Sequence, residues 1–190
     1  MIWTMVASDK KKVVTVREFE RFLIRPENTE RLFELINGEI VEKVPKQLHA
    51  LIAALFASAF VTYFREHPIG WVFVEVRVKL PNSDINDLIP DVAAALEEGR
   101  TLAEEEPLTY MPEVVVEIQS PDQSDKFMID KANLYLAHGA RIVIIVYASK
   151  RLIEVLRPDD RKLLIETDTL ELNDLLPGFA VLVQELFPRK

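Results

Sequence analysis

The sequence predicts an α/β domain built around a mixed β-sheet flanked by helices, with a further helix and a β-hairpin at the N-terminus. Segments with a period of two and segments with a helical period follow one another along the chain. The 190 residues include 49% hydrophobic residues, which is enough for one domain with a sizeable core. No internal repeat or linker-like stretch interrupts the pattern, so we expect a single domain over residues 1–190.

The N-terminal part is predicted to form a helix and then a hairpin. Thr15 is a suitable N-cap for VREFERFLI, whose apolar residues recur at helical spacing. Residues 31–43 contain Asn37-Gly38, a strong hairpin signal because both turn positions need a positive φ. Pairing outward from this turn gives two faces. One face holds Phe33, Leu35 and Ile40, and the other holds Glu34, Ile36, Glu39 and Val41.

The remaining elements follow from length and periodicity. The apolar run at 46–66 is at the short limit for crossing a bilayer, so we interpret it as a buried helix of a soluble domain. Strands are expected at 71–80, 88–96, 114–119 and 141–148, and a strand pair in RLIEVLRP and KLLIETD. Residues 97–112 are acidic and contain two prolines, which indicates a surface loop. Ser124 should cap a helix that runs to about His138 and ends at Gly139.

Composition excludes several kinds of chemistry. There are no cysteines and only three histidines, which excludes disulfides, thiolate catalysis and cysteine-ligated metals. Such a chain suits a reducing compartment, and we expect it in the cytoplasm without a membrane. The net charge of −8 lacks the basic footprint of a typical nucleic-acid-binding protein. An acidic metal-dependent site would contribute to the same imbalance.

The stretch VVVEIQSPDQSDK places polar residues on a buried strand. Because side chains two apart face the same way, Val114, Val116 and Ile118 point to one side and Glu117 and Gln119 to the other. A buried carboxylate is costly unless it is paired, hydrogen-bonded or bound to a metal. A rigid strand is therefore a suitable platform for a divalent cation.

A second carboxylate interrupts an apolar strand at IPDV. Pro90 favours an extended Ile89 and cannot donate in a β-ladder, and Asp91 follows it directly. We expect Asp91 and Glu117 to lie close enough to share one ion. Oxygen ligands without cysteine favour Mg²⁺ or Mn²⁺.

A cation is expected beside this pair of carboxylates. Lys131 lies between Phe127 and Tyr135 at i, i+4 spacing on the helix after Ser124, and could reach Glu117. Taken singly, each candidate has a plainer interpretation. Glu117 can be an ion-paired strand residue, Asp91 a strand-start residue, Glu34 and Lys131 solvent-facing residues, and His49 a core or rim histidine. Only the combination indicates a functional site.

The same residues resemble a known pattern. Pro90-Asp91 followed by Glu117-x-Gln119 resembles the PD-(D/E)xK signature of restriction-endonuclease-like nucleases. Further segments occur in the order found in the Uma family of bacterial endonuclease-like proteins, long classed as a domain of unknown function. They are FELINGEIVEKVP, LHALI, LIPDVA, PEVVVEIQSPDQSDKFMIDKANLYLAHGARIVIIV and LLPGF. The resemblance runs from about Val14 to Phe187.

This resemblance implies a restriction-endonuclease-like mixed-sheet core and Mg²⁺- or Mn²⁺-assisted hydrolysis of phosphodiester bonds. Carried over by position, Asp91 and Glu117 would be metal ligands and Glu34 a further acid near the site. The signature lysine is replaced by Gln119, which can orient water but cannot neutralise charge, and Lys131 would stand in for it. DNA is the expected partner, and a homodimer is expected because duplex cleavage needs two sites.

Two other functions remain open from the sequence. Gln119 and the net charge of −8 also suit a catalytically inert nucleic-acid or protein interaction module of the same fold. An acid-rich site would also suit a phosphohydrolase that acts on small molecules.

Overall fold

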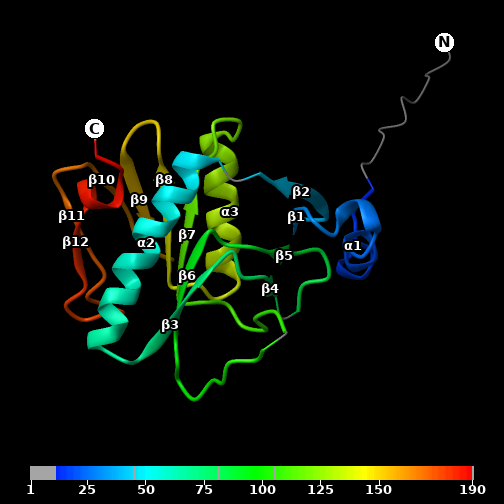
Figure 1. Cartoon of the computed structure of the whole chain (residues 1–190), viewed down its shortest axis with the longest axis horizontal. Helices are drawn as coiled ribbons and strands as arrows, with labels where there is room; N and C mark the ends of the chain where they lie inside the picture. Colours follow the sequence, from blue (N-terminus) through cyan, green and yellow to red (C-terminus); the bar gives the residue numbers. More distant parts are fainter. Residues whose placement is uncertain (1–11, 45, 81, 105, 190) are drawn as a thin grey trace, which may run out of the picture.

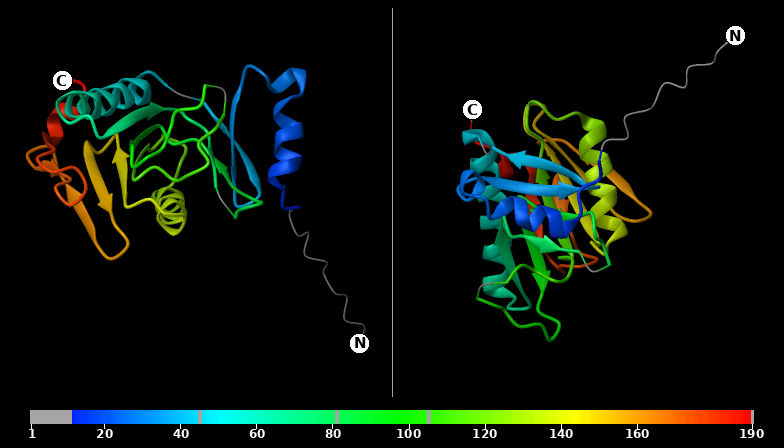
Figure 2. Two further views of the ribbon diagram at one scale, coloured as in Figure 1. Left: turned by 90° about the horizontal axis from the view of Figure 1, so that it is seen from below. Right: turned by 90° about the vertical axis from the view of Figure 1, so that its right-hand side faces the viewer.

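A six-stranded mixed sheet forms the centre of the protein (Figure 1). The computed structural model describes residues 12–44, 46–80, 82–104 and 106–189. The strand order is β10-β9-β8-β7-β6-β3. The strands are β3 (Gly70–Val74), β6 (Val92–Leu96), β7 (Val114–Ile118), β8 (Ile142–Tyr147), β9 (Leu152–Leu156) and β10 (Arg161–Leu164). Helix α2 (Gln47–Glu66) covers one face and α3 (Asp125–Ala137) the other (Figure 2).

The sheet is mixed because α3 carries the chain from β7 back to the start of β8, which makes this one pair parallel. The other neighbouring pairs in the sheet are antiparallel. The predicted alternation along β7 is confirmed. Val114, Val116 and Ile118 join the apolar cluster under α2, whereas Val115 joins the cluster under α3. Both faces of β7 are therefore buried, and Glu117 lies on the face covered by α3.

A smaller sheet carries the predicted hairpin. Its order is β2-β1-β5-β4, with β1 at Leu32–Ile36, β2 at Glu39–Lys43, β4 at Val78–Lys79 and β5 at Asp87–Leu88. Helix α1 (Val16–Leu23) begins with the predicted Thr15 cap, which forms a capping box with Glu18. Phe19 of α1 packs on Phe33 and Leu35, the apolar face predicted from the turn register.

Two predicted strands are wrong in their extent, and both errors concern the passage between the sheets. Residues 71–80 break at Glu75, whose φ is 51°, so β3 stays in the large sheet and β4 joins the small one. Residues 88–96 split likewise, because Leu88 ends β5 and Val92 begins β6. Pro90 in the junction has no N–H to donate to a ladder. Asp91 is thereby placed between the two sheets.

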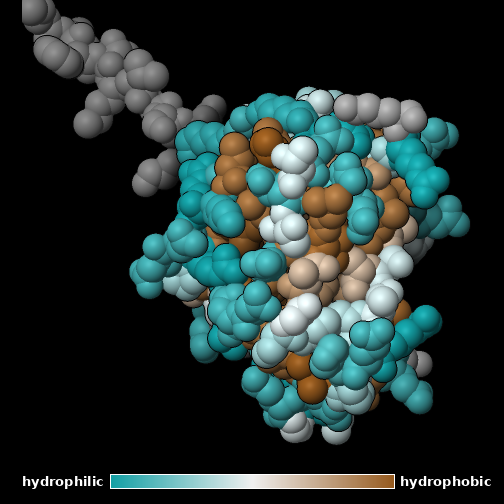
Figure 3. Space-filling model, turned by 90° about the vertical axis from the view of Figure 1, so that its left-hand side faces the viewer, coloured by the Kyte–Doolittle hydropathy of each residue, from teal (hydrophilic) through white to brown (hydrophobic). Residues whose placement is uncertain are grey.

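The C-terminal part closes the α2 side of the large sheet. It consists of β11 (Thr169–Glu171), which pairs with β12 (Ala180–Leu182), and the 3₁₀ turn η2 (Val183–Leu186). In the N-terminal part, another 3₁₀ turn, η1 (Pro26–Asn28), follows α1. Apolar side chains emerge between hydrophilic ones on this end of the molecule (Figure 3). Exposed apolar residues of the described chain include Leu163 and Ile165, and scattered exposure of this kind is usual.

Helix α2 meets the length and composition criteria for a membrane-spanning helix, alone among the helices of the described residues. In this structure it lies along the sheet. Ile52, Phe56 and Phe60 are at most 1% exposed within the main apolar cluster. The packing is that of a core helix, while Leu51 and Val61 lie on its outer side and are exposed.

The hairpin turn gives a first prediction. Gly38 has a φ of +77°, and a Cβ there would lie 2.2 Å from Val13 Cγ1. Gly99 has the same φ with no atom within 4 Å of its virtual Cβ. Gly99→Ala should therefore lower the free energy of unfolding only by the strain of a left-handed backbone, about 1–2 kcal/mol. Gly38→Ala should lower it by clearly more, because the added Cβ would also clash with Val13. Urea unfolding of both variants measures the difference, and equal losses would contradict the crowding at Gly38.

Candidate active site

Glu34 is held at the centre of the small sheet with its carboxylate pointing away from α1. The hairpin register pairs it with Val41, on the face opposite to Phe33 and Leu35. The residue is 2% exposed, and its Oε1 accepts a hydrogen bond of 2.7 Å from the Ile89 N–H. Glu34 thus binds the junction that precedes Asp91. The predicted position of its side chain, on the same side as Asp91, is confirmed by the pocket that both residues line.

Glu117 is joined to α3 through two side chains. The Lys131 Nζ lies 2.9 Å from Glu117 Oε2 and also 2.9 Å from the carboxylate of Glu34. The Tyr135 hydroxyl donates a 2.6 Å hydrogen bond to Glu117 Oε1. Lys131 is 3% exposed. The predicted approach of Lys131 to Glu117 is confirmed, and one ammonium bridges two buried carboxylates from different sheets.

Asp91 has partners on both carboxylate oxygens. Oδ1 accepts a 2.5 Å hydrogen bond from Lys43 Nζ. Oδ2 accepts a 2.7 Å hydrogen bond from the Ile118 N–H, and His49 Nε2 lies 3.0 Å from the same oxygen. The bond to Ile118 fixes the Asp91 carboxylate beside the residue that follows Glu117. The two acids are brought together at the edge where β6 begins and β7 ends.

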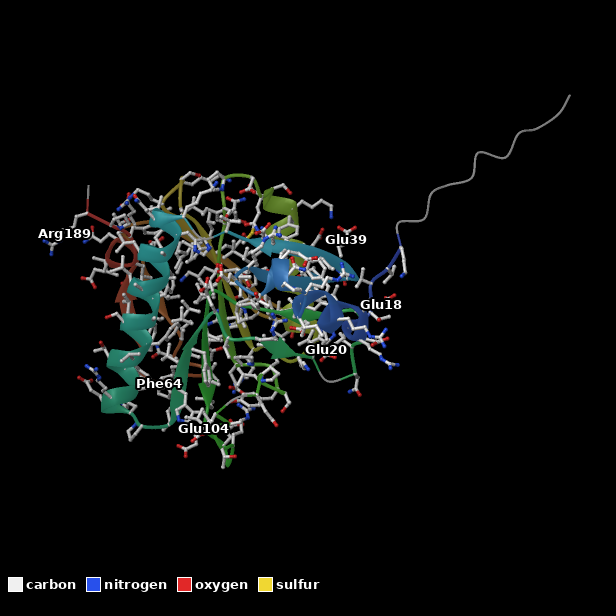
Figure 4. All side chains as sticks on the ribbon, turned by 45° about the vertical axis from the view of Figure 1, so that its right-hand side comes forward. Glu18, Glu20, Glu39, Phe64, Glu104 and Arg189 are labelled. Carbon is white, nitrogen blue, oxygen red and sulfur yellow. The ribbon has the colours of Figure 1, made fainter. Side chains whose placement is uncertain are left out.

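These groups line one pocket of about 170 Å³. Its lining includes Glu34, Lys43, His49, Asp91, Glu117 and Lys131, with Glu42, Lys46, Asp122 and Gln123 among its other polar residues. Glu39, the other carboxylate of the predicted hairpin face, lies at the outer end of the hairpin (Figure 4). Only one of the two acids on that face therefore contributes to the pocket.

Burial and charge act against each other in this pocket. Burial raises the pKa of the Glu117 carboxyl to about 7, although the Lys131 ammonium opposes the shift. Burial alone would also raise the pKa of Asp91, but Lys43 and His49 outweigh it and hold that pKa below its ordinary value. Burial alone would lower the pKa of Lys131, yet Glu117 and Glu34 raise it. The lysines therefore stay charged, and their charge is what makes the buried carboxylates tolerable.

Gln119 is not brought to this pocket, contrary to the expectation that it would act beside Glu117. Its Nε2 donates to the Gln123 carbonyl at 3.1 Å and to Asp125 Oδ1 at 2.8 Å. Strand β7 ends at Ile118, so the alternation that placed Gln119 on the same face as Glu117 no longer applies. Gln119 shapes the loop that leads into α3, and its amide does not substitute for a signature lysine.

Two residues of the pocket were missed by the sequence analysis. Lys43 lies two residues after Val41, so the hairpin register already placed it on the Glu34 face. His49 lies in the first turn of α2 and had been interpreted as a core or rim histidine. Its position depends on how α2 meets the sheet, for which the sequence carries no local signal.

Comparison with protein families decides which family this chain belongs to. Residues 16–184 match the model of Uma2, described as "Putative restriction endonuclease". The chain belongs to the Uma2 family. A solved structure with a similar fold is described as a putative nuclease belonging to DUF820 from Anabaena variabilis ATCC 29413. It shares 22% identity, a TM-score of 0.77, and coverage of 92% of this chain and 97% of that chain. A search of curated proteins found no match.

The site of this Uma2 protein suits a hard divalent cation with few protein ligands. No three His, Asp or Glu side chains converge as a metal-binding group within the described residues. Mg²⁺ needs no such group, because it keeps several waters and binds through one or two carboxylates. Asp91 and Glu117 line the same polar pocket. The Lys43 ammonium already occupies a cation position there, 2.5 Å from Asp91 Oδ1 and 2.6 Å from the Ile89 carbonyl.

Proposed function

We propose that this Uma2 protein is a Mg²⁺- or Mn²⁺-dependent endonuclease that hydrolyses phosphodiester bonds of DNA. The observation that carries the proposal is the Lys131 ammonium, which lies 2.9 Å from both Glu34 and Glu117 in the pocket that also holds Asp91. Paired acids can hold the cation of metal-assisted phosphodiester hydrolysis, and a nearby ammonium can offset charge on the phosphate. Membership of the family described as "Putative restriction endonuclease" supports the same reaction class.

Each residue has a role in this proposal. Asp91 and Glu117 would hold the cation, which when bound would supply Lewis acidity. The Lys131 ammonium offsets the negative charge that develops on the phosphate during hydrolysis. Glu34 acts as a positioning residue, because it holds Lys131 by an ion pair and the Ile89 N–H by a hydrogen bond. Tyr135 orients Glu117 through its hydroxyl.

Cleavage of DNA with each metal tests the function. Supercoiled plasmid, linear duplex and single-stranded oligonucleotides, incubated with Mg²⁺ or Mn²⁺, should be cut by the wild type. Asp91→Asn should reduce cleavage by about 100-fold or more, as removal of one catalytic group usually does. Asp122→Asn is the matched control, because Asp122 is an exposed acid of the same pocket. Loss of cleavage in the control as well as in Asp91→Asn would count against the assignment of Asp91.

An inert interaction module is the second candidate, and one observation favours it. Asp91 and Glu117 each have a lysine ammonium within 3 Å in this structure, so both carboxylates are ion-paired without a metal. Binding of DNA without cleavage in either metal, and without any dependence on Asp91, would favour this candidate over the nuclease.

We also propose that the protein acts on duplex DNA as a homodimer, since cutting both strands needs two sites. Sedimentation velocity should then give the mass of two copies for the free protein, and the mass of two copies plus the DNA for its complex with a short duplex. A strict monomer in both measurements would count against the dimer without affecting the proposed chemistry.

A further inference from the structure

We infer that Lys43 is an exchangeable counter-ion of this site: its ammonium occupies the place at Asp91 that a divalent cation takes, so cation binding requires Lys43 to leave. The inference rests on the proposed function for the identity of the site, and it adds a residue that controls the affinity for the metal.

The contacts of Lys43 are those of a bound cation. Its Nζ lies 2.5 Å from Asp91 Oδ1 and 2.6 Å from the Ile89 carbonyl oxygen. Carboxylate and carbonyl oxygens are also the ligands that hard divalent cations take in proteins. The second oxygen of Asp91 accepts the Ile118 N–H and lies beside His49. Oδ1 is therefore the oxygen left for a metal, and Lys43 holds it.

The charge count favours exchange of Lys43 for a divalent ion. Three buried carboxylates, of Glu34, Asp91 and Glu117, face the two ammonium groups of Lys43 and Lys131. With every carboxylate ionised and the neighbouring His49 ring uncharged, one negative charge is left over. Replacement of the Lys43 ammonium by a divalent cation leaves none, and a buried cluster is more stable when its charges balance.

Lys43 is also the lysine that can leave. It is the last residue of β2, and its neighbours Glu42 and Val44 are exposed. Its side chain is 11% exposed, against 2% for Lys131 in the middle of α3. A long flexible stem at the mouth of the pocket allows the ammonium to turn to water. Lys131 has no comparable exit and stays with Glu34 and Glu117.

Titration calorimetry with Mn²⁺ in the absence of DNA tests the inference. Lys43→Met should bind Mn²⁺ about 10- to 100-fold more tightly than the wild type, the range over which groups around a ligand change metal affinity. Lys46→Met is the matched control. It removes the same charge from the lining of the same pocket, but Lys46 is exposed and has no bond to Asp91. Its affinity should stay close to that of the wild type.

Thermal unfolding gives a second readout that needs no cleavage. Metal-free Lys43→Met should melt below the wild type, because Asp91 loses its cation, and Mn²⁺ should raise its melting temperature more than that of the wild type. The double variant Lys43→Met/Asp91→Asn should lose the gain in Mn²⁺ affinity. Lys43→Gln, which keeps a hydrogen-bond donor for Asp91, serves if Lys43→Met does not fold without metal.

Equal Mn²⁺ affinity of the wild type and the Lys43 variants would overturn the inference, as would a gain that survives Asp91→Asn or appears equally in Lys46→Met. These results are separable from the test of function. Tight, Asp91-dependent binding in Lys43→Met without cleavage of any DNA would support the counter-ion and reject the nuclease. Cleavage by the wild type with unchanged Mn²⁺ affinity in Lys43→Met would do the reverse.

Discussion

Lys131→Met is expected to lose cleavage and a large part of the stability of the protein. Lys131 is 3% exposed and lies 2.9 Å from the carboxylates of Glu34 and Glu117. Removing one partner from a buried ion pair costs about 3–5 kcal/mol, because the remaining charge has no compensation. Methionine keeps the volume of the stem, so the loss reports on charge and not on a cavity. Urea unfolding measures it.

The same variant should cleave DNA about 100- to 1,000-fold more slowly, the usual effect of removing one group that stabilises transition-state charge. Glu34→Gln/Lys131→Met separates the two losses. It removes one of the two orphaned carboxylate charges, so it should regain stability relative to Lys131→Met while cleavage stays low. Unchanged cleavage by Lys131→Met, measured at a temperature where it is folded, would reject the proposed charge-stabilising role.

The loss of stability expected for Lys131→Met follows from the structure and not from the sequence. From sequence alone, Lys131 could equally be a solvent-facing residue of an amphipathic helix. The large stability cost follows from its burial between two sheets. The surrounding architecture explains why: Glu34 comes from the small sheet, Glu117 from the large one, and Lys131 from the helix that covers both. The ammonium that we propose to act in cleavage thus also holds the two sheets together.

Much of the site could be predicted because two local rules decide it. Alternation along β7 separates Glu117 from Val116, and the Asn37-Gly38 turn places Glu34 opposite Phe33 and Leu35. Both rules act over a few residues and need no knowledge of the rest of the fold. The N-caps at Thr15 and Ser124 were predictable for the same reason, because each depends on a side chain and an N–H three residues later.

The remaining parts depend on relations between elements. The chain leaves the large sheet after Val74 and returns at Val92. The alternation of apolar and polar residues does not mark either point, and only Pro90 indicates a break in the second strand. His49 reaches Asp91 only because α2 begins beside the junction. Lys43 was within reach of the hairpin rule, yet a lysine at the end of a strand is usually solvent-facing. Its role depends on a carboxylate 48 residues away in sequence.

Phe60→Ala should cost as much stability as Lys131→Met but leave the chemistry unchanged. The Phe60 ring is 0% exposed and stacks on Phe179 with ring centroids 5.1 Å apart. Truncation of a buried phenylalanine costs about 3–5 kcal/mol, through lost burial and the cavity left behind. Phe60 lies in α2 eleven residues beyond His49, which is about 16 Å along the helix. It packs in the apolar cluster under α2 and does not line the pocket.

This variant distinguishes a catalytic loss from a loss of folded protein. In urea, the unfolding midpoints of Phe60→Ala and Lys131→Met should move to similar, lower concentrations. In a cleavage assay well below both melting temperatures, Phe60→Ala should keep nearly the wild-type rate while Lys131→Met falls. Two equally slow variants would mean that cleavage follows stability alone, because a core residue remote from Asp91 and Glu117 would then matter as much as the ammonium between Glu34 and Glu117.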